Sequence, residues 1–192
     1  MRGRLIAFLL AIGTLSGVAA ALVAHSDAAM PRAGNNAGNN AGNNWHEIAW
    51  PFPRDGWPAG RAFRCDAAAC GEAVELYVRP KIGFCNCDSG VADDDEVDRV
   101  ADLDLISLTF APVEAGRVVH VAEMAGRARR YDLNMTDGSK HAAVGFALSR
   151  RCDLLVAVAQ GEGDADKVQR VAADFLGSNN MTRWMTAALN GG

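Results

Sequence analysis

Five cysteines constrain this chain of 192 residues more than any other feature, because their short spacings allow few covalent arrangements. Four residues separate Cys65 from Cys70, and a single asparagine separates Cys85 from Cys87. In an oxidising compartment, thiols this close in sequence are normally paired in disulfides. A bridge between Cys85 and Cys87 is disfavoured, since a one-residue gap strains disulfide geometry. We therefore expect Cys65 and Cys70 to pair with Cys85 and Cys87, in one of two connectivities.

Cys152 makes the number of cysteines odd. It comes just before an apolar run, which favours a buried free thiol, with a cysteine of another chain as the alternative partner. We expect no cofactor. The alternative is that Cys85 and Cys87 bind a soft metal, copper as Cu(I) or zinc, or exchange disulfides as a redox pair.

The amino-terminal residues predict export, which is the compartment that the disulfide interpretation requires. Arg2 and Arg4 precede an uncharged stretch from Leu5 to Ala24, and small residues follow it. This order is typical of a signal peptide, and the stretch is also long enough to remain as a membrane anchor with its amino end in the cytoplasm. We therefore assign residues 1–28 to a signal peptide or an anchor. The expected location is the periplasm, or the inner membrane facing the periplasm.

A short repeat follows this segment. The sequence Ala-Gly-Asn-Asn occurs three times in succession from residue 33 to residue 44. Such a composition has no apolar face to bury and a high backbone entropy, so residues 29–44 are predicted to form a flexible linker. The remaining residues, 45–192, are numerous enough for one globular domain with its own core.

Composition excludes several classes of protein. Apolar residues make up 49% of the chain and charged residues 22%, which excludes general disorder and a multi-span membrane protein. The formal net charge of −4 gives no cationic surface for a nucleic acid. The partners that this interpretation allows are the membrane, if residues 1–28 are retained, and another envelope protein.

Periodicity in residues 45–192 predicts an α+β fold with a mostly antiparallel sheet and two amphipathic helices at the carboxyl end. A capping box of Asp93 and Glu96 predicts a further helix. Asp164 and Asn180 are the expected caps of the two final helices, and Gly177 ends the first of them. The expected strands are residues 73–79 (ended by Pro80), 105–113, 117–124, 127–133, 141–148 and 151–160, the last of them central.

The segment from residue 45 to residue 58 combines three prolines with four large aromatic side chains. The prolines forbid a helix interior or a central strand. We expect the rings to pack on the domain, since large rings mainly supply buried area, although such a surface can also dock a polyproline segment or a sugar ring.

Charged residues are unevenly distributed. Eight carboxylates lie between Asp88 and Asp104, with one base among them, and this run lacks the order of a calcium loop. Arginines alternate at positions 127 and 129, so they share one face of a strand, as do Arg79 and Lys81. Two such rows on neighbouring strands would allow Arg79, Arg127 and Arg129 to bind an anion. The alternative is that they pair internally with the acidic run.

Motifs for catalysis are missing from the sequence: it has no phosphate-binding loop, nucleophile elbow, dinucleotide fingerprint or zinc-protease motif. Our expectation is therefore a non-catalytic, exported accessory or binding domain, tethered to the membrane if the first segment is retained. The alternative is a thiol-redox or soft-metal protein that acts through Cys85-Asn86-Cys87.

Overall fold

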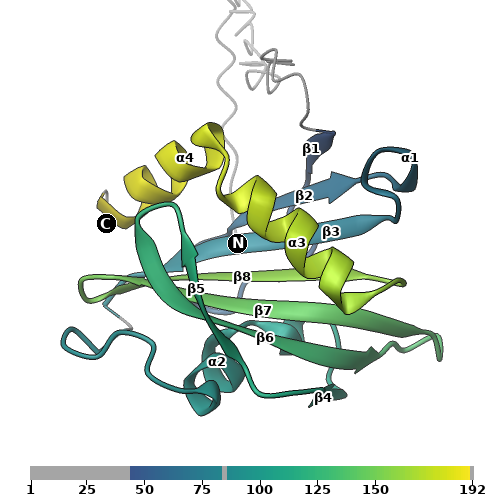
Figure 1. Cartoon of the computed structure of the whole chain (residues 1–192), viewed down its shortest axis with the longest axis horizontal. Coiled ribbons are helices and arrows are strands. Elements are labelled where there is room, and N and C mark those ends of the chain that lie inside the picture. Colours follow the sequence, from purple (N-terminus) through teal and green to yellow (C-terminus); the bar gives the residue numbers. More distant parts are fainter. Residues whose placement is uncertain (1–43, 84–85, 191–192) are drawn as a thin grey trace, which may run out of the picture. The chain divides into compact units, whose positions relative to one another are not determined.

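An antiparallel sheet of eight strands organises the chain in a computed structural model, which describes residues 44–83 and 86–190 (Figure 1). The predicted anchor, most of the predicted linker, and Cys85 lie outside the described residues. The strand order is β1-β2-β3-β8-β7-β6-β4, and β5 also pairs with β6. The strands are β1 (Trp45–Ile48), β2 (Arg61–Cys65), β3 (Val74–Lys81), β4 (Phe110–Pro112), β5 (Arg117–Val121), β6 (Met124–Asn134), β7 (Lys140–Arg150) and β8 (Asp153–Gly161).

The helices complete the predicted α+β fold, which the structure confirms together with the two helices at the carboxyl end. They are α1 (Ala67–Cys70), α2 (Asp94–Val100), α3 (Ala165–Leu176) and α4 (Asn179–Asn190), with one 3₁₀ turn at Leu103–Leu105. No helix within residues 44–83 and 86–190 is long and apolar enough to cross a membrane.

Strand β8 is central, as its apolar run predicts, because it lies between β3 and β7. Its side chains alternate between two cores on opposite faces of the sheet. Leu155 and Ala157 belong to the core beneath α3 and α4, while Leu154 and Val156 belong to the core beneath α2. All of them are buried, which explains why this strand shows no polar alternation.

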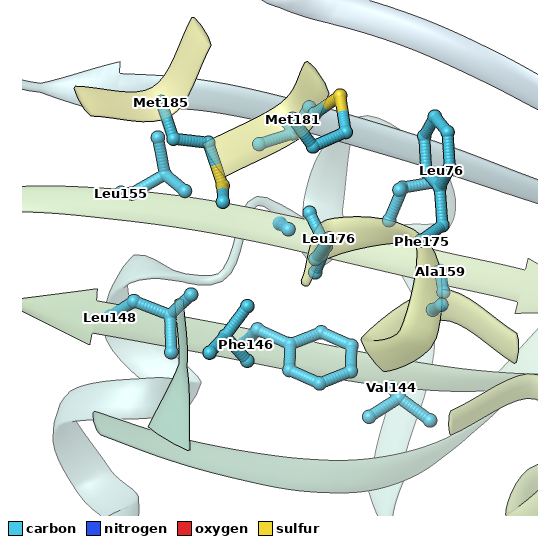
Figure 2. Close-up of a cluster of buried hydrophobic side chains, with 14 of the residues drawn as sticks. Leu76, Val144, Phe146, Leu148, Leu155, Ala159, Phe175, Leu176, Met181 and Met185 are labelled. Atoms are coloured by element: carbon cyan, nitrogen blue, oxygen red, sulfur yellow. The ribbon is translucent and has the colours of Figure 1, made fainter. Parts of the chain in front are cut away.

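Helices α3 and α4 cover the first face. Figure 2 shows Phe175, Leu176, Met181 and Met185 from the helices over the side chains of β3, β7 and β8. Asp164 caps α3 as predicted, since its side chain accepts a hydrogen bond from the Lys167 amide. The predicted cap of the second helix is wrong, because α4 begins at Asn179. Ser178 caps it instead, and its Oγ accepts from the Met181 amide at 3.4 Å.

Local structure differs from expectation at two further places. The predicted strand 105–113 is reduced to β4, because a 3₁₀ turn precedes it and the Ser107 hydroxyl holds the following bend through the Asn134 carbonyl at 2.6 Å. Pro80 does not end β3, which continues to Lys81. Strand β2 begins at Arg61, opposite Val78, and does not reach Pro80, so the described part of the sheet places only β8 beside Pro80.

A glycine determines how closely β6 approaches β7. A Cβ added at Gly126 would lie 1.9 Å from the Ala147 carbonyl oxygen and 2.8 Å from the Leu148 Cα, so the backbone would have to move. We expect Gly126→Ala to lower the free energy of unfolding by about 1–3 kcal/mol, measured by urea denaturation. The control is Gly177→Ala, where the nearest atom is 3.3 Å away and φ is −74°. The control should change stability by less than about 0.5 kcal/mol, and equal effects would contradict the steric explanation.

Candidate functional site

Three carboxylates of the acidic run face the sheet, because Asp94, Asp98 and Asp102 are spaced four residues apart. Asp94 accepts a hydrogen bond from Arg127 Nε at 2.9 Å, and Asp98 accepts one from Arg129 Nη1 at 2.7 Å. The two arginines lie two residues apart on one face of β6, and the two carboxylates lie four residues apart on one face of α2, so each arginine meets one carboxylate. This confirms the alternative in which the arginine row pairs internally with the acidic run.

A second cluster of charges surrounds Asp102. Its carboxylate accepts from Arg79 Nε at 2.6 Å and from Lys81 Nζ at 2.7 Å. Arg79 also donates to Asp55, through Nη1 at 2.9 Å and Nη2 at 2.6 Å. Two buried cations on β3 are therefore matched by two carboxylates from other segments.

The structure does not bring Arg79 close to Arg127 and Arg129. The first residue lies on β3 and the other two on β6, and strands β8 and β7 lie between them. The expectation that the two rows occupy neighbouring strands is therefore wrong. Each of the three guanidinium groups donates to a carboxylate, so none presents a vacant fork to an anion from these positions.

The segment between β1 and β2, residues 49–60, runs over this second cluster, and we call it the strap. Asp55 joins the strap to Arg79, and the Trp57 ring centroid lies 5.6 Å from Lys81 Nζ. Trp50 and Phe52 pack edge-on against Tyr77, with ring centroids 6.2 and 4.7 Å away. These aromatic side chains are partly buried, which supports the packing interpretation of the segment.

A pocket of about 450 Å³ opens beside the strap, within the size range of small-molecule sites. It joins the strap to β3, to the region of α2 and to β4. Its walls combine aromatic, apolar and charged side chains: Asp55, Trp57, Arg79, Lys81, Asp98, Arg99, Asp102, Leu103, Asp104 and Phe110. Sequence reasoning missed Asp55 and Asp102 as partners, although the four-residue spacing of the carboxylates signals that one side of this segment faces the sheet.

Electrostatics at the site stabilise the ion pairs. Hydrogen bonds from Arg79 lower the pKa of Asp55 to about 2, against the opposing effect of burial. Burial alone would lower the pKa of Arg79, but its hydrogen bonds to Asp102 and Asp55 raise it above the usual value. Burial and a hydrogen bond to Asp98 raise the pKa of Tyr131. These shifts hold each group in its ordinary state near neutral pH, the opposite of what a general acid or base needs.

The Asp55 contact should make the attachment of the strap depend on acidity. The folded pKa of Asp55 lies below its usual 3.8, so its contribution is complete above about pH 4 and is lost as the pH falls towards about 2. We expect the difference in unfolding free energy between the wild-type protein and Asp55→Asn to shrink over this window, measured by urea denaturation at each pH. A constant difference from pH 6 to pH 2 would contradict this assignment.

The disulfides differ from the predicted pairs. Cys65 bonds to Cys70, with a Cα–Cα distance of 6.0 Å, and Cys87 bonds to Cys152, with a distance of 4.3 Å. The prediction that Cys65 and Cys70 pair with Cys85 and Cys87 is wrong, as is the free thiol at Cys152. The reason lies in the sheet: Lys81 pairs with Leu154, so the chain leaving β3 lies next to the turn before β8.

The Cys87–Cys152 bond bears on the alternative in which Cys85 and Cys87 bind a soft metal or exchange disulfides. Cys87 is held by Cys152, whereas a soft metal requires a thiolate and a redox dithiol requires Cys87 to be reduced. Within the ranges that the structure describes, no group of three or more His, Cys, Asp and Glu side chains is placed to hold a metal ion. No catalytic machinery is evident among these residues.

Fold and site thus define an α+β protein with two disulfides and a pocket whose buried charges are paired. No protein-family model matches the sequence, and no curated protein matches it. Among solved structures, the chain is similar to a protein of unknown function, PA94, from Pseudomonas aeruginosa, at 12% identity and a TM-score of 0.36, over 70% of this chain and 80% of that one. It is also similar to cyanobacterial PsbP (CyanoP) from Synechocystis sp. PCC 6803, at 13% identity and a TM-score of 0.41, over 69% of this chain and 78% of that one.

Proposed function

We propose that this chain is an exported accessory domain, tethered to the membrane by residues 1–28, that binds a ligand in the pocket beside the strap without transforming it. The pocket carries this proposal. Its buried cations, Arg79 and Lys81, are matched by Asp55 and Asp102, so its charges stabilise the walls and are not poised for reaction.

The two disulfides support the export part of the proposal, because such bonds persist in oxidising compartments. One of them fastens the chain that leads towards α2 to the turn before β8, and the other closes a short loop at the end of β2. Both therefore hold chain segments in place beside the sheet, as structural disulfides do in exported domains.

Cell fractionation tests the location. The full chain is produced in a Gram-negative host, free thiols are blocked with N-ethylmaleimide at lysis, and intact mass is measured before reduction and again after reduction and a second alkylation. We expect the protein in the membrane fraction, released by detergent, with at most one alkylated cysteine before reduction and five after it. Cytoplasmic protein with four or five alkylated cysteines before reduction would overturn export. Release without detergent would overturn the tether.

A further inference from the structure

The charged side chains that line the pocket are not equally exposed. Side-chain exposure is 30% for Asp55 and 34% for Asp98, but only 3% for Arg79 and 7% for Lys81. The two cations are therefore less exposed than the carboxylates that pair with them. Among the lining side chains with substantial exposure, carboxylates outnumber cations, although the nominal charges of the lining nearly cancel.

Asp104 adds a further carboxylate to this lining. It is exposed in the 3₁₀ turn Leu103–Leu105, and it makes no hydrogen bond or ion pair within the part of the chain that the structure describes. Among the lining residues that the structure describes, Arg99 is the one exposed cation, at 59%, and its guanidinium lies 3.7 Å from Glu96, which does not line the pocket. Asp104 is thus a negative charge that the fold itself leaves uncompensated.

Aromatic rings complete the walls. Trp57 and Phe110 both line the pocket, and a cation is attracted to the face of such a ring. The Trp57 ring already takes part in one contact of this kind, with Lys81. Rings beside carboxylates form a combination suited to an organic cation, because the rings attract the cation and pack against its alkyl part, while the carboxylates accept hydrogen bonds from its charged group.

From this asymmetry we infer that the pocket binds an organic cation of small-molecule size, bearing a guanidinium or alkylammonium group. The inference rests on the proposed binding function and adds the chemical class of the ligand. The charged group lies towards Asp104 and Asp98, and the alkyl part lies against Trp57 and Phe110. The buried ion pairs of Arg79 and Lys81 stay intact during binding.

A matched pair of probes tests this assignment. Butylguanidinium and butylurea have nearly the same shape and differ in charge, and both are titrated into the protein at 0.15 M salt. Binding is followed by the NMR shifts of the Trp57, Asp104 and Phe110 amides. We expect butylguanidinium to bind at least tenfold more tightly than butylurea. A blocked arginine, N-acetyl-arginine methylamide, identifies the source of the cationic group. Binding weaker than or equal to that of butylguanidinium fits a free small cation. Binding tighter than that of butylguanidinium assigns the pocket to an arginine side chain of a partner protein.

Three variants localise the effect. Asp104→Asn should weaken butylguanidinium binding about two- to fivefold, and Arg99→Gln should strengthen it about twofold. Asp95→Asn removes the same charge from an exposed position of α2 that does not line the pocket, and it should leave binding unchanged. Equal weakening by Asp104→Asn and Asp95→Asn would overturn the assignment to this pocket.

The remaining outcomes separate the ligand class from the binding function. Pocket shifts with butylurea, or with the anion butylsulfonate, as strong as those with butylguanidinium would overturn the cation and retain the pocket as a binding site. If none of the probes shifts the pocket amides, both the ligand class and the proposed binding function are overturned.

Discussion

Replacing Asp102 by alanine should lower the free energy of unfolding by about 3–5 kcal/mol, which we expect to be the largest effect of any single substitution considered. The carboxylate of Asp102 accepts hydrogen bonds from both Arg79 and Lys81, and both cations are buried. Without it, Arg79 would keep the Asp55 carboxylate, but both cations, which have little access to water, would lose the negative charge that they share. The cost arises mainly from leaving a buried charge uncompensated, and less from the loss of an attraction.

Urea denaturation at pH 7 measures this effect, and Asp104→Ala is its control. Asp104 lies two residues away, is exposed and has no partner among the described residues, so the control should stay within about 0.5 kcal/mol of the wild-type protein. Asp102→Asn adds a second test, because asparagine tolerates the left-handed backbone of Asp102 (φ 36°) and keeps one acceptor oxygen. It should fall between wild type and Asp102→Ala. If Asp102→Ala and Asp102→Asn were both as stable as the wild-type protein, the expected cost would be contradicted, and water would have to reach the two cations.

Loss of the Cys87–Cys152 bond should cost about 4 kcal/mol, and loss of the Cys65–Cys70 bond about 2 kcal/mol. The difference follows from sequence separation, 65 residues against five, because a bond that closes the longer loop removes more entropy from the unfolded chain. The double variants Cys87→Ala/Cys152→Ala and Cys65→Ala/Cys70→Ala are compared by urea denaturation without reductant.

The ranking of the two variants is the sharper test, because native-state effects can change each value separately. If the Cys65–Cys70 variant is the less stable one, loop closure does not determine the effect. Because Cys65 is fully buried, packing around its sulfur would then be the explanation, and cavity size at that position would be the next quantity to measure.

The sequence predicted those parts of the fold that depend on neighbouring residues. The run 154–158 identified the central strand because both of its faces are buried, and apolar periodicity identified α3, where Val168, Ala172 and Leu176 are buried. Asp93 was recognised as a cap of α2, although Glu96 reaches back to the Ala92 amide, one residue earlier than in a capping box.

Features that depend on distant segments were not predictable in this way. The Cys87–Cys152 pair requires the register in which Lys81 meets Leu154, and local spacing contains no information about that register. The pocket requires the strap, β3 and the segment after α2 to meet at one place. Asp55 and Asp102 are separated by 47 positions in the sequence, yet they share Arg79. Alternating arginines and carboxylates at intervals of four were the only local signs of this arrangement.

The shared guanidinium of Arg79 affects how the pocket responds to a ligand. The guanidinium of Arg79 joins two walls of the pocket, because it donates to Asp55 from the strap and to Asp102 from the segment after α2. Moving either wall away would remove one of the two carboxylates that neutralise this buried cation. The cavity is therefore preorganised: its empty and filled shapes should nearly coincide. The pocket then loses little conformational entropy when a ligand binds, and its selectivity follows from shape complementarity with rigid walls.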